Sequence, residues 1–213
     1  FLERFWEFIK GAVQLDFGVS YITKTSVSDE LIERFPRTLK LALLSICVSA
    51  LFGIPIGILC AIKANKLPDR IALVLTLLCN SMPSFWLALL LVLLFSVNLN
   101  WLPSGGIGGA QYYVLPVISS SIGSIAGIAR QTRASMLEVI RADYVTTAKS
   151  KGLSQKAVIL KHALGNALIP IITVIGGQFS FLMGGTTIVE SVYSFPGLGL
   201  YIISGINNRD YPI

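Results

Sequence analysis

The residue types that most often carry out chemistry are sparse and scattered in this sequence. His162 is the sole histidine, and neither a cysteine nor a second histidine lies near it. Cys47, Cys60 and Cys79 lie inside apolar runs, and no two of them have metal-ligand spacing. No Ser/His/Asp set can be assembled, and no G-x-x-x-x-G-K-[ST] phosphate loop is present. The sequence therefore predicts no catalytic, cofactor-binding or metal-binding residue, and it predicts a turn-packing role for His162.

Uncharged polar side chains inside long apolar runs form a second set with possible function. The candidates for a transport pathway are Asn80, Ser81, Ser120, Ser124 and Gln178. Polar groups at membrane depth often mark a pathway, although a serine can also bond back to a carbonyl of its own helix. None of the five is an acid, which a proton-coupled transporter is expected to carry in the membrane.

Glu190 lies at the end of the last long apolar run. It is a candidate for an outer gate, and it could instead pair with Arg209. The simplest expectation is that Glu190 is a solvated helix end.

These residues belong to a strongly apolar chain. Hydrophobic residues make up 54% and charged residues 13% of the 213 residues, against about 25% charged in soluble domains, and the mean hydropathy is +0.73. This composition excludes a disordered chain. Four stretches are long enough to cross a hydrocarbon core of about 30 Å, namely about 38–62, 71–97, 112–129 and 167–189. A large soluble protein with buried helices is disfavoured, because 71–97 contains no charged residue.

Two small-residue motifs predict places where helices approach closely. They are Gly53-x-x-x-Gly57 and Gly123-x-x-x-Gly127. We expect both to serve packing within one subunit.

Basic residues gather in two of the segments between the apolar stretches. Segment 63–70 has three basic residues and one acid, and segment 130–162 has seven basic residues and two acids. The remaining segments carry almost no net charge, namely 1–37, 98–111 and 191–213. The positive-inside rule places the two basic loops in the cytoplasm and both ends of the chain outside. No nucleic-acid partner is predicted, because the larger basic loop offers only Tyr144 for base stacking.

Within the larger basic loop, segment 141–152 predicts a short helix. Asp143 is expected at its N-cap, and Gly152 is expected just after its last residue, where left-handed backbone is common. Ser154 is expected to cap a second helix. The apolar residues that share a face of the short helix by their spacing are Tyr144, Val145 and Ala148. Such a helix is either a plug for a partner's groove or an amphipathic linker on the lipid surface, and spacing alone leaves both open.

Segment 146–152, Thr-Thr-Ala-x-x-x-Gly, resembles the EAA motif of ABC importer permeases. More specifically, the chain resembles the B-type permease of the dipeptide, oligopeptide and nickel uptake family. The supporting stretches are Leu-Asp-Phe-Gly (15–18), Ser-Met-Pro-Ser-Phe-Trp-Leu (81–87), Trp-Leu-Pro-Ser-Gly-Gly (101–106), Arg-Ala-Ser-Met-Leu-Glu-Val (133–139), Asp-Tyr-Val-Thr-Thr-Ala-Lys-Ser-Lys-Gly-Leu (143–153), His-Ala-Leu-Gly-Asn-Ala-Leu-Ile-Pro (162–170), Phe-Pro-Gly-Leu-Gly (195–199) and Arg-Asp-Tyr-Pro (209–212). Thr146 stands where many importers have Glu, a departure that the peptide and nickel branch commonly shows.

The resemblance implies an all-α membrane protein with the type I ABC importer transmembrane fold. Permeases of this family have six membrane helices, so four of the six would be present and we expect the chain to be incomplete at both ends. Residues 1–37 would be an extracytoplasmic segment and 38–213 the transmembrane domain, with 130–165 as its cytoplasmic coupling loop. The ATPase-coupling helix of the family falls on Asp143, Tyr144, Val145, Thr146, Thr147, Ala148, Lys149 and Gly152.

The implied function is that of a permease subunit that translocates peptides or nickel chelates delivered by an extracytoplasmic binding protein. The implied partners are a second homologous permease, two ABC ATPase subunits, the binding protein and membrane lipid. The chain would be no enzyme and would bind no cofactor, since ATP-Mg would be held by the ATPase subunits. It would be a multi-pass protein of the bacterial plasma (inner) membrane.

Two other classes of protein remain as rivals. A stand-alone channel or secondary transporter predicts ion-coupled acids in the membrane and transport without an ATPase. A membrane-bound enzyme or assembly factor predicts a cluster of titratable residues at the membrane face, and the sequence shows none. Within the favoured family, the residues leave the choice between peptide and nickel open.

Overall fold

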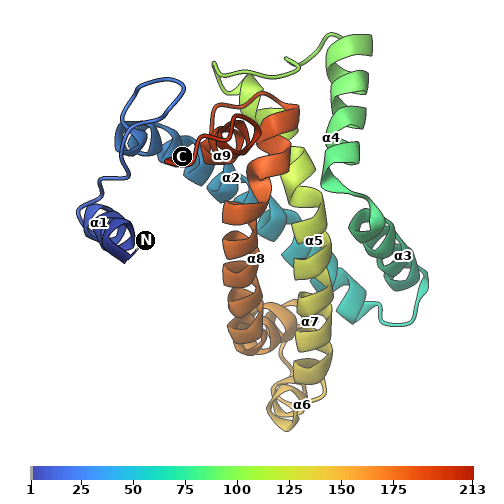
Figure 1. Cartoon of the computed structure of the whole chain (residues 1–213). Coiled ribbons are helices and arrows are strands. Elements are labelled where there is room, and N and C mark those ends of the chain that lie inside the picture. Colours follow the sequence, from blue (N-terminus) through green and yellow to red (C-terminus); the bar gives the residue numbers. More distant parts are fainter. Residues whose placement is uncertain (1) are drawn as a thin grey trace.

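The computed structural model describes residues 2–213, apart from the side chains of residues 2–4, 7, 8 and 149. Its helices are α1 (Leu2–Val13), α2 (Val27–Ile62), α3 (Leu67–Ser81), α4 (Ser84–Leu91), the π-helix η1 (Val92–Asn98), α5 (Gln111–Ile140), α6 (Asp143–Ser150), α7 (Gln155–Ala157), the π-helix η2 (Val158–Ala163), α8 (Leu164–Val192) and α9 (Leu198–Asn207). Figure 1 shows α5 and α8 side by side, α2 crossing behind them, and α6 at one tip of the molecule.

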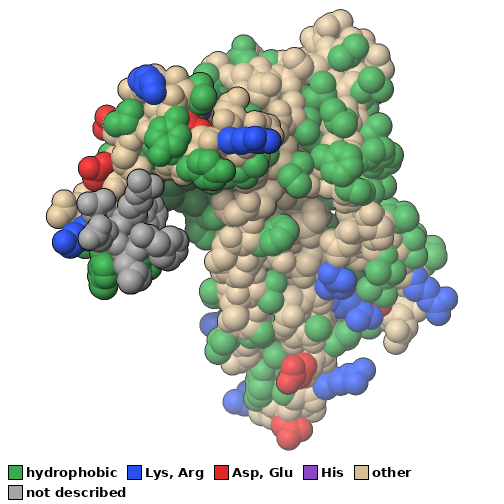
Figure 2. Space-filling model, viewed as in Figure 1, with side chains coloured by type: hydrophobic (Ala, Val, Ile, Leu, Met, Phe, Trp, Pro, Cys, Tyr) green, Lys and Arg blue, Asp and Glu red, His purple; other side chains and the backbone are tan. Residues whose placement is uncertain are grey.

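Three helices are long and apolar enough to cross a membrane. They are α2, α5 and the continuous helix Gln155–Val192, which α7, η2 and α8 form together. A fourth span is formed if α3 is counted together with α4 and η1. Apolar side chains cover much of the outward surface of α4 and η1, as expected for helices that face lipid or another membrane subunit (Figure 2).

The helix α2 begins at Val27, well before the expected membrane stretch 38–62. Its N-cap is Ser26, whose Oγ accepts a hydrogen bond from the amide of Asp29 at 3.4 Å. An ion pair of 2.7 Å between Arg34 and Glu30, one turn apart, adds a small stabilisation on the exposed part of the helix. Local charge and capping therefore extend the helix beyond its apolar stretch.

The expected single helix 71–97 is instead two helices that meet at an angle of 97°. Pro83 lies at the break, between Ser81 at the end of α3 and Ser84 at the start of α4. A proline has no amide proton and disfavours helical backbone at the residue before it. Met82 is accordingly extended, with φ −83° and ψ 124°. The prediction of one membrane helix over 71–97 is therefore corrected to two helices that meet at Pro83.

The expected loop 130–165 is largely helical. α5 continues to Ile140, and the last long helix begins at Gln155. The two helices therefore extend past the apolar stretches, and the segment between them is short and consists mainly of α6.

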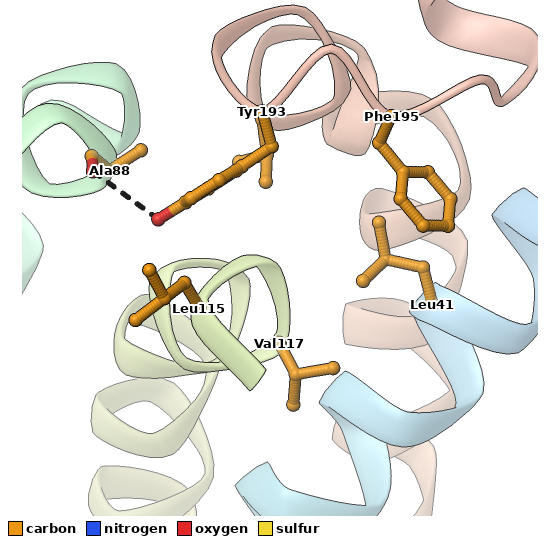
Figure 3. Close-up of a cluster of buried hydrophobic side chains, with 7 residues drawn as sticks. Leu41, Ala88, Leu115, Val117, Tyr193 and Phe195 are labelled. Carbon is orange, nitrogen blue, oxygen red and sulfur yellow. Dashed lines mark hydrogen bonds between the residues drawn. The ribbon is translucent and has the colours of Figure 1, made fainter. Parts of the chain in front are cut away.

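The largest buried apolar cluster joins four membrane helices at the end opposite α6 (Figure 3). Its buried members are Leu41, Ala88, Leu115, Val117, Val189, Tyr193 and Phe195. The hydroxyl of Tyr193 donates to the carbonyl of Ala88 at 3.3 Å, so this buried phenol is satisfied and ties the end of α8 to α4.

α2 and α5 approach closely through glycines on α2. A Cβ added at Gly57 would lie 2.5 Å from the Cβ of Thr132, and one added at Gly53 would lie 2.9 Å from the Cβ of Ile128. Packing within the subunit is thus confirmed for the motif 53–57. In the motif 123–127 it holds for Gly127, whose added Cβ would lie 3.1 Å from Gln178 Nε2 on α8, and it is wrong for Gly123, where an added Cβ would meet no heavy atom within 4 Å.

The outer segment 18–26 is fastened to the end of the chain through Asp210. Ser20 Oγ donates to its carboxylate at 2.5 Å, and the amides of Tyr21 and Ile22 donate at 2.9 and 3.3 Å. Burial opposes the charged form, but these hydrogen bonds and the positive charge of Lys24 outweigh it and lower the pKa of Asp210 below its ordinary value. The two outer ends of the chain are therefore linked by a charge-assisted contact.

Candidate functional site

The first candidate site is α6, which lies at one tip of the molecule and is held between two long helices (Figure 1). Val145 and Ala148 on α6 are buried, with exposed fractions of 0% and 6%, and they pack against Val158 of η2. Val139 of α5 packs against the same cluster. α6 is therefore anchored to both α5 and the helix that continues into α8.

The opposite face of α6 is open. Tyr144 is 45% exposed whereas Val145 and Ala148 are buried, so the prediction that the three share one face is wrong for Tyr144. At i and i+1 the two side chains Tyr144 and Val145 lie about 100° apart on a helix, and only Val145 reaches η2. The other exposed members of the predicted coupling set are Asp143, Thr146, Thr147 and Gly152. The side chain of Lys149 lies outside the described residues.

The ends of α6 differ slightly from the prediction. Asp143 is the first helical residue, and the cap position belongs to Ala142, whose carbonyl accepts from the amides of Val145 and Thr146 at 3.0 and 3.3 Å. Asp143 still lies in the first turn, where a negative charge favours the helix. Gly152 is in the left-handed region with φ +77°, as predicted. Ser154 caps the next helix, since its Oγ accepts from the amide of Ala157 at 3.4 Å.

The second candidate site is a cavity of about 480 Å³ at the bend between α3 and α4, which we call the kink cavity. α5 and α8 form its other walls. The polar and charged side chains that line it are Asn80, Ser84, Ser119, Ser120, Ser124, Arg130 and Gln178. Ser124 and Gln178 are joined by a hydrogen bond of 3.1 Å between Oγ and Oε1, which links α5 to α8.

The structure brings four of the five pathway candidates into this cavity. Asn80, Ser120, Ser124 and Gln178 all line it. Ser81 does not, and its Oγ donates to the carbonyl of Leu77 at 2.9 Å, which is the alternative role considered for serines. Sequence reasoning missed Arg130, because a basic residue at the end of a span is ordinarily assigned to the cytoplasmic loop.

Glu190 is fully buried, so the expectation of a solvated helix end is wrong. Thr38 Oγ1 donates to its Oε1 at 2.7 Å, and the amide of Leu200 donates to its Oε2 at 3.1 Å. The carboxylate thus caps the first turn of α9 from another helix. A Cβ at Gly197 would lie 2.4 Å from Oε1, which explains the need for glycine at this position.

A partly buried ion pair joins the N-terminal part of α3 to the C-terminal part of α5. Arg133 Nε lies 2.6 Å from Asp69 Oδ1, and its Nη2 lies 2.7 Å from Oδ2. The amide of Asn65 also donates to Asp69 at 2.8 Å. This bidentate pair was not foreseen, since the two residues are far apart in the sequence and each had been assigned to a solvated loop.

Residues with metal-ligand chemistry remain dispersed. No group of three or more His, Cys, Asp or Glu able to hold a metal occurs in the part of the chain that the structure describes. His162 is half-buried in η2. It lies within a continuous helix rather than in the predicted turn.

A bundle of bent and straight apolar helices, a polar cavity at membrane depth and an anchored helix at one tip define a membrane transport subunit. Residues 53–213 match the family described as "Binding-protein-dependent transport system inner membrane component". The chain belongs to this family, and it is a permease subunit of a bacterial ABC importer, a multi-pass protein of the inner membrane.

Curated relatives carry the same assignment. The glutathione transport system permease protein GsiC of Escherichia coli strain K12 is 42% identical over 210 residues, covering 99% of this chain and 69% of the relative. The protein of the same name from Shigella dysenteriae serotype 1 matches to the same extent.

Solved structures confirm the fold. An amino acid ABC transporter crystallised with histidines aligns with TM-score 0.64 and 21% identity, over 87% of this chain and 82% of that chain. The inward-facing MetNI methionine ABC transporter aligns with TM-score 0.66 and 18% identity, over 82% and 79%. The predicted all-α fold of an ABC importer transmembrane domain is therefore confirmed.

Proposed function

We propose that the chain is the translocating subunit of a peptide importer. It would pair with a second homologous permease, receive substrate from an extracytoplasmic binding protein, and be driven by two separate ATPase subunits that hold ATP-Mg. Peptides are favoured over nickel because the similar proteins are named for the transport of glutathione, which is a tripeptide. The chain itself would bind no cofactor.

The observation that carries this proposal is the anchoring of α6. Val145 and Ala148 attach it to both long helices of the tip, while Tyr144 stays open to a partner. A force applied to the exposed face would therefore move α5 and α8 together, and both helices line the kink cavity. This geometry favours a plug for a partner's groove over a linker on lipid.

The test is ATP hydrolysis by the assembled complex, stimulated by the loaded binding protein. A buried aromatic anchor at an interface contributes about 2 kcal/mol or more, so Tyr144→Ala should weaken ATPase binding about 30-fold and abolish stimulation. Tyr211→Ala, which removes an 85% exposed tyrosine from the outer side, is the matched control and should leave stimulation unchanged. Equal stimulation in both variants, or transport by the permeases without the ATPases, would contradict the proposal.

Two further substitutions examine the rigidity of α6. Ala148→Asp places a charge against Val158, and Gly152→Val forces a branched side chain into left-handed backbone. Each should uncouple ATP hydrolysis from substrate. Retained coupling in either variant would count against rigid transmission.

The orientation of the tip has its own test. A thiol introduced by Thr147→Cys, at an exposed position of α6, should react with a membrane-impermeant reagent only from the cytoplasmic side. Reaction from the outside of intact cells would reverse the proposed topology.

A further inference from the structure

The kink cavity has an uneven charge. Arg130 is the one charged residue among the described residues that line it, and no acid lines it with Arg130. Arg133, one turn further along α5, is neutralised by Asp69. No such ion pair involves Arg130 among the described side chains. The cavity therefore carries a net positive charge at one end.

A polar strip on α5 leads to this charge. Ser120, Gly123, Ser124, Gly127 and Arg130 follow helical spacing and all line the cavity, which places them on one face. The strip from Ser120 to Arg130 is about 15 Å long at the rise of an α-helix. Its far end lies in the membrane part of α5, and Arg130 lies toward the cytoplasmic tip.

The strip has room near its middle and a buried hydroxyl without a partner at its far end. A Cβ at Gly123 would meet nothing within 4 Å, so the wall is open there. The Oγ of Ser120 is buried and has no hydrogen-bond partner within the described residues. A buried hydroxyl without a partner is costly.

We infer that the kink cavity takes a small molecule bearing a carboxylate, and that Arg130 binds this carboxylate on the cytoplasmic side of the cavity. A guanidinium binds a carboxylate with two parallel hydrogen bonds, and the exposed side chain of Arg130 leaves these donors accessible from the cavity. A bare divalent cation would meet the same positive charge and no acidic ligand among the described lining residues. The inference rests on the proposed function and specifies the substrate class of the same subunit.

The experiment uses the complete importer in proteoliposomes with saturating binding protein. The probes are alanyl-alanine and the same dipeptide with its carboxylate converted to an amide. For each probe, initial uptake by a variant is divided by wild-type uptake, so selection by the binding protein cancels. Arg130→Gln should lower uptake of the free acid about tenfold, the loss expected for one charge-assisted contact, and should lower uptake of the amide less than twofold.

Two variants separate binding from assembly and from overall charge. Arg130→Lys keeps the positive charge but loses the paired hydrogen bonds, and should retain more uptake of the free acid than Arg130→Gln. Arg70→Gln removes an exposed arginine on the cytoplasmic side, away from the cavity lining, and should behave as wild type. The inference is overturned if Arg130→Gln leaves uptake of the free acid intact, lowers both probes equally, or matches Arg70→Gln.

A nickel arm distinguishes the two sources of carboxylate. If the importer takes up Ni²⁺ as its citrate complex and not the dipeptide, the cavity still binds a carboxylate, and that carboxylate belongs to a metal chelate. Uptake of Ni²⁺ without a chelator would overturn it. If the wild-type complex shows no ATP-dependent uptake of any probe, the proposed function itself fails, whereas wild-type uptake that is insensitive to Arg130 refutes only this inference.

Discussion

The ion pair between Asp69 and Arg133 supports an asymmetric prediction. The carboxylate of Asp69 is 1% exposed, whereas the side chain of Arg133 is 22% exposed. Arg133→Met keeps the apolar stem and leaves a buried carboxylate with only the amide of Asn65 as partner. Asp69→Ala leaves a guanidinium that water can reach. Removing the arginine should therefore cost more than removing the acid.

The magnitudes follow from burial. Leaving a buried charge without its partner costs about 3–5 kcal/mol, so we expect about 3 kcal/mol for Arg133→Met. We expect about 1.5 kcal/mol for Asp69→Ala, since a partly exposed arginine recovers some hydration. The double variant removes both charges and should cost about 2 kcal/mol less than the sum of the single variants.

Cys60 provides the assay. Its side chain is buried, with an exposed fraction of 4%, and it lines one small cavity together with Arg133. In a background with Cys47→Ser and Cys79→Ser, a thiol reagent reaches it only when this region opens locally. Its labelling rate in the assembled importer should rise about 100-fold in Arg133→Met and about tenfold in Asp69→Ala. Arg141→Met, at an exposed arginine after α5, is the control and should label as wild type.

The reasoning is refuted by either of two results. Equal increases in the two single variants would mean that burial does not set the cost. A double variant whose rate increase equals the product of the single increases would mean that the two charges do not stabilise each other.

Three further predictions concern packing, capping and pH. Gly57→Ala should lower the thermal unfolding midpoint of the complex, at a cost of about 1–3 kcal/mol, because its Cβ would clash with Thr132, whereas Gly123→Ala should leave the midpoint unchanged. Glu190→Ala should cost about 2–4 kcal/mol, because it leaves the buried hydroxyl of Thr38 and the partly buried amide of Leu200 without an acceptor, and proteolysis near α9 should accelerate. The pKa of Asp210 is lower in the folded state than in the unfolded state. The stabilisation that its carboxylate gives to the folded state is therefore present above the unfolded-state pKa and is lost as pH falls through the folded-state pKa. Protease cleavage between residues 14 and 26 from the outside should therefore increase in strong acid, and the increase should be absent in an Asp210→Asn variant, which should be cleaved readily at every pH.

The membrane class, the short helix over 143–150 and four of the polar residues that line the kink cavity could be predicted from the sequence. The length of the apolar runs indicates the membrane class, and the capping residues indicate the short helix. Asn80, Ser124 and Gln178 stood out because polar side chains are rare in apolar runs. These features are set by residues that are close together in the sequence, so the spacing of residue types is enough to predict them.

Features that depend on contacts between distant segments could not be predicted. Glu190 looked like a solvated helix end because its partners, Thr38 and the first turn of α9, approach it only in the folded bundle. The two glycine motifs have the same spacing, yet Gly57 touches α5 while Gly123 faces a cavity. Pattern alone gives no information on which neighbour a helix face meets.

The break at Pro83 has a consequence for recognition in the kink cavity. The last turn of α3 leaves carbonyl groups, and the first turn of α4 leaves amide groups, without partners inside their own helices. Cys79, Asn80 and Ser84 bring these turns to the cavity wall. These main-chain groups would give the wall a binding capacity that no single side-chain replacement near the bend removes. Relatives could change the side chains at 79–82 and at 84 and keep it, provided that Pro83 remains.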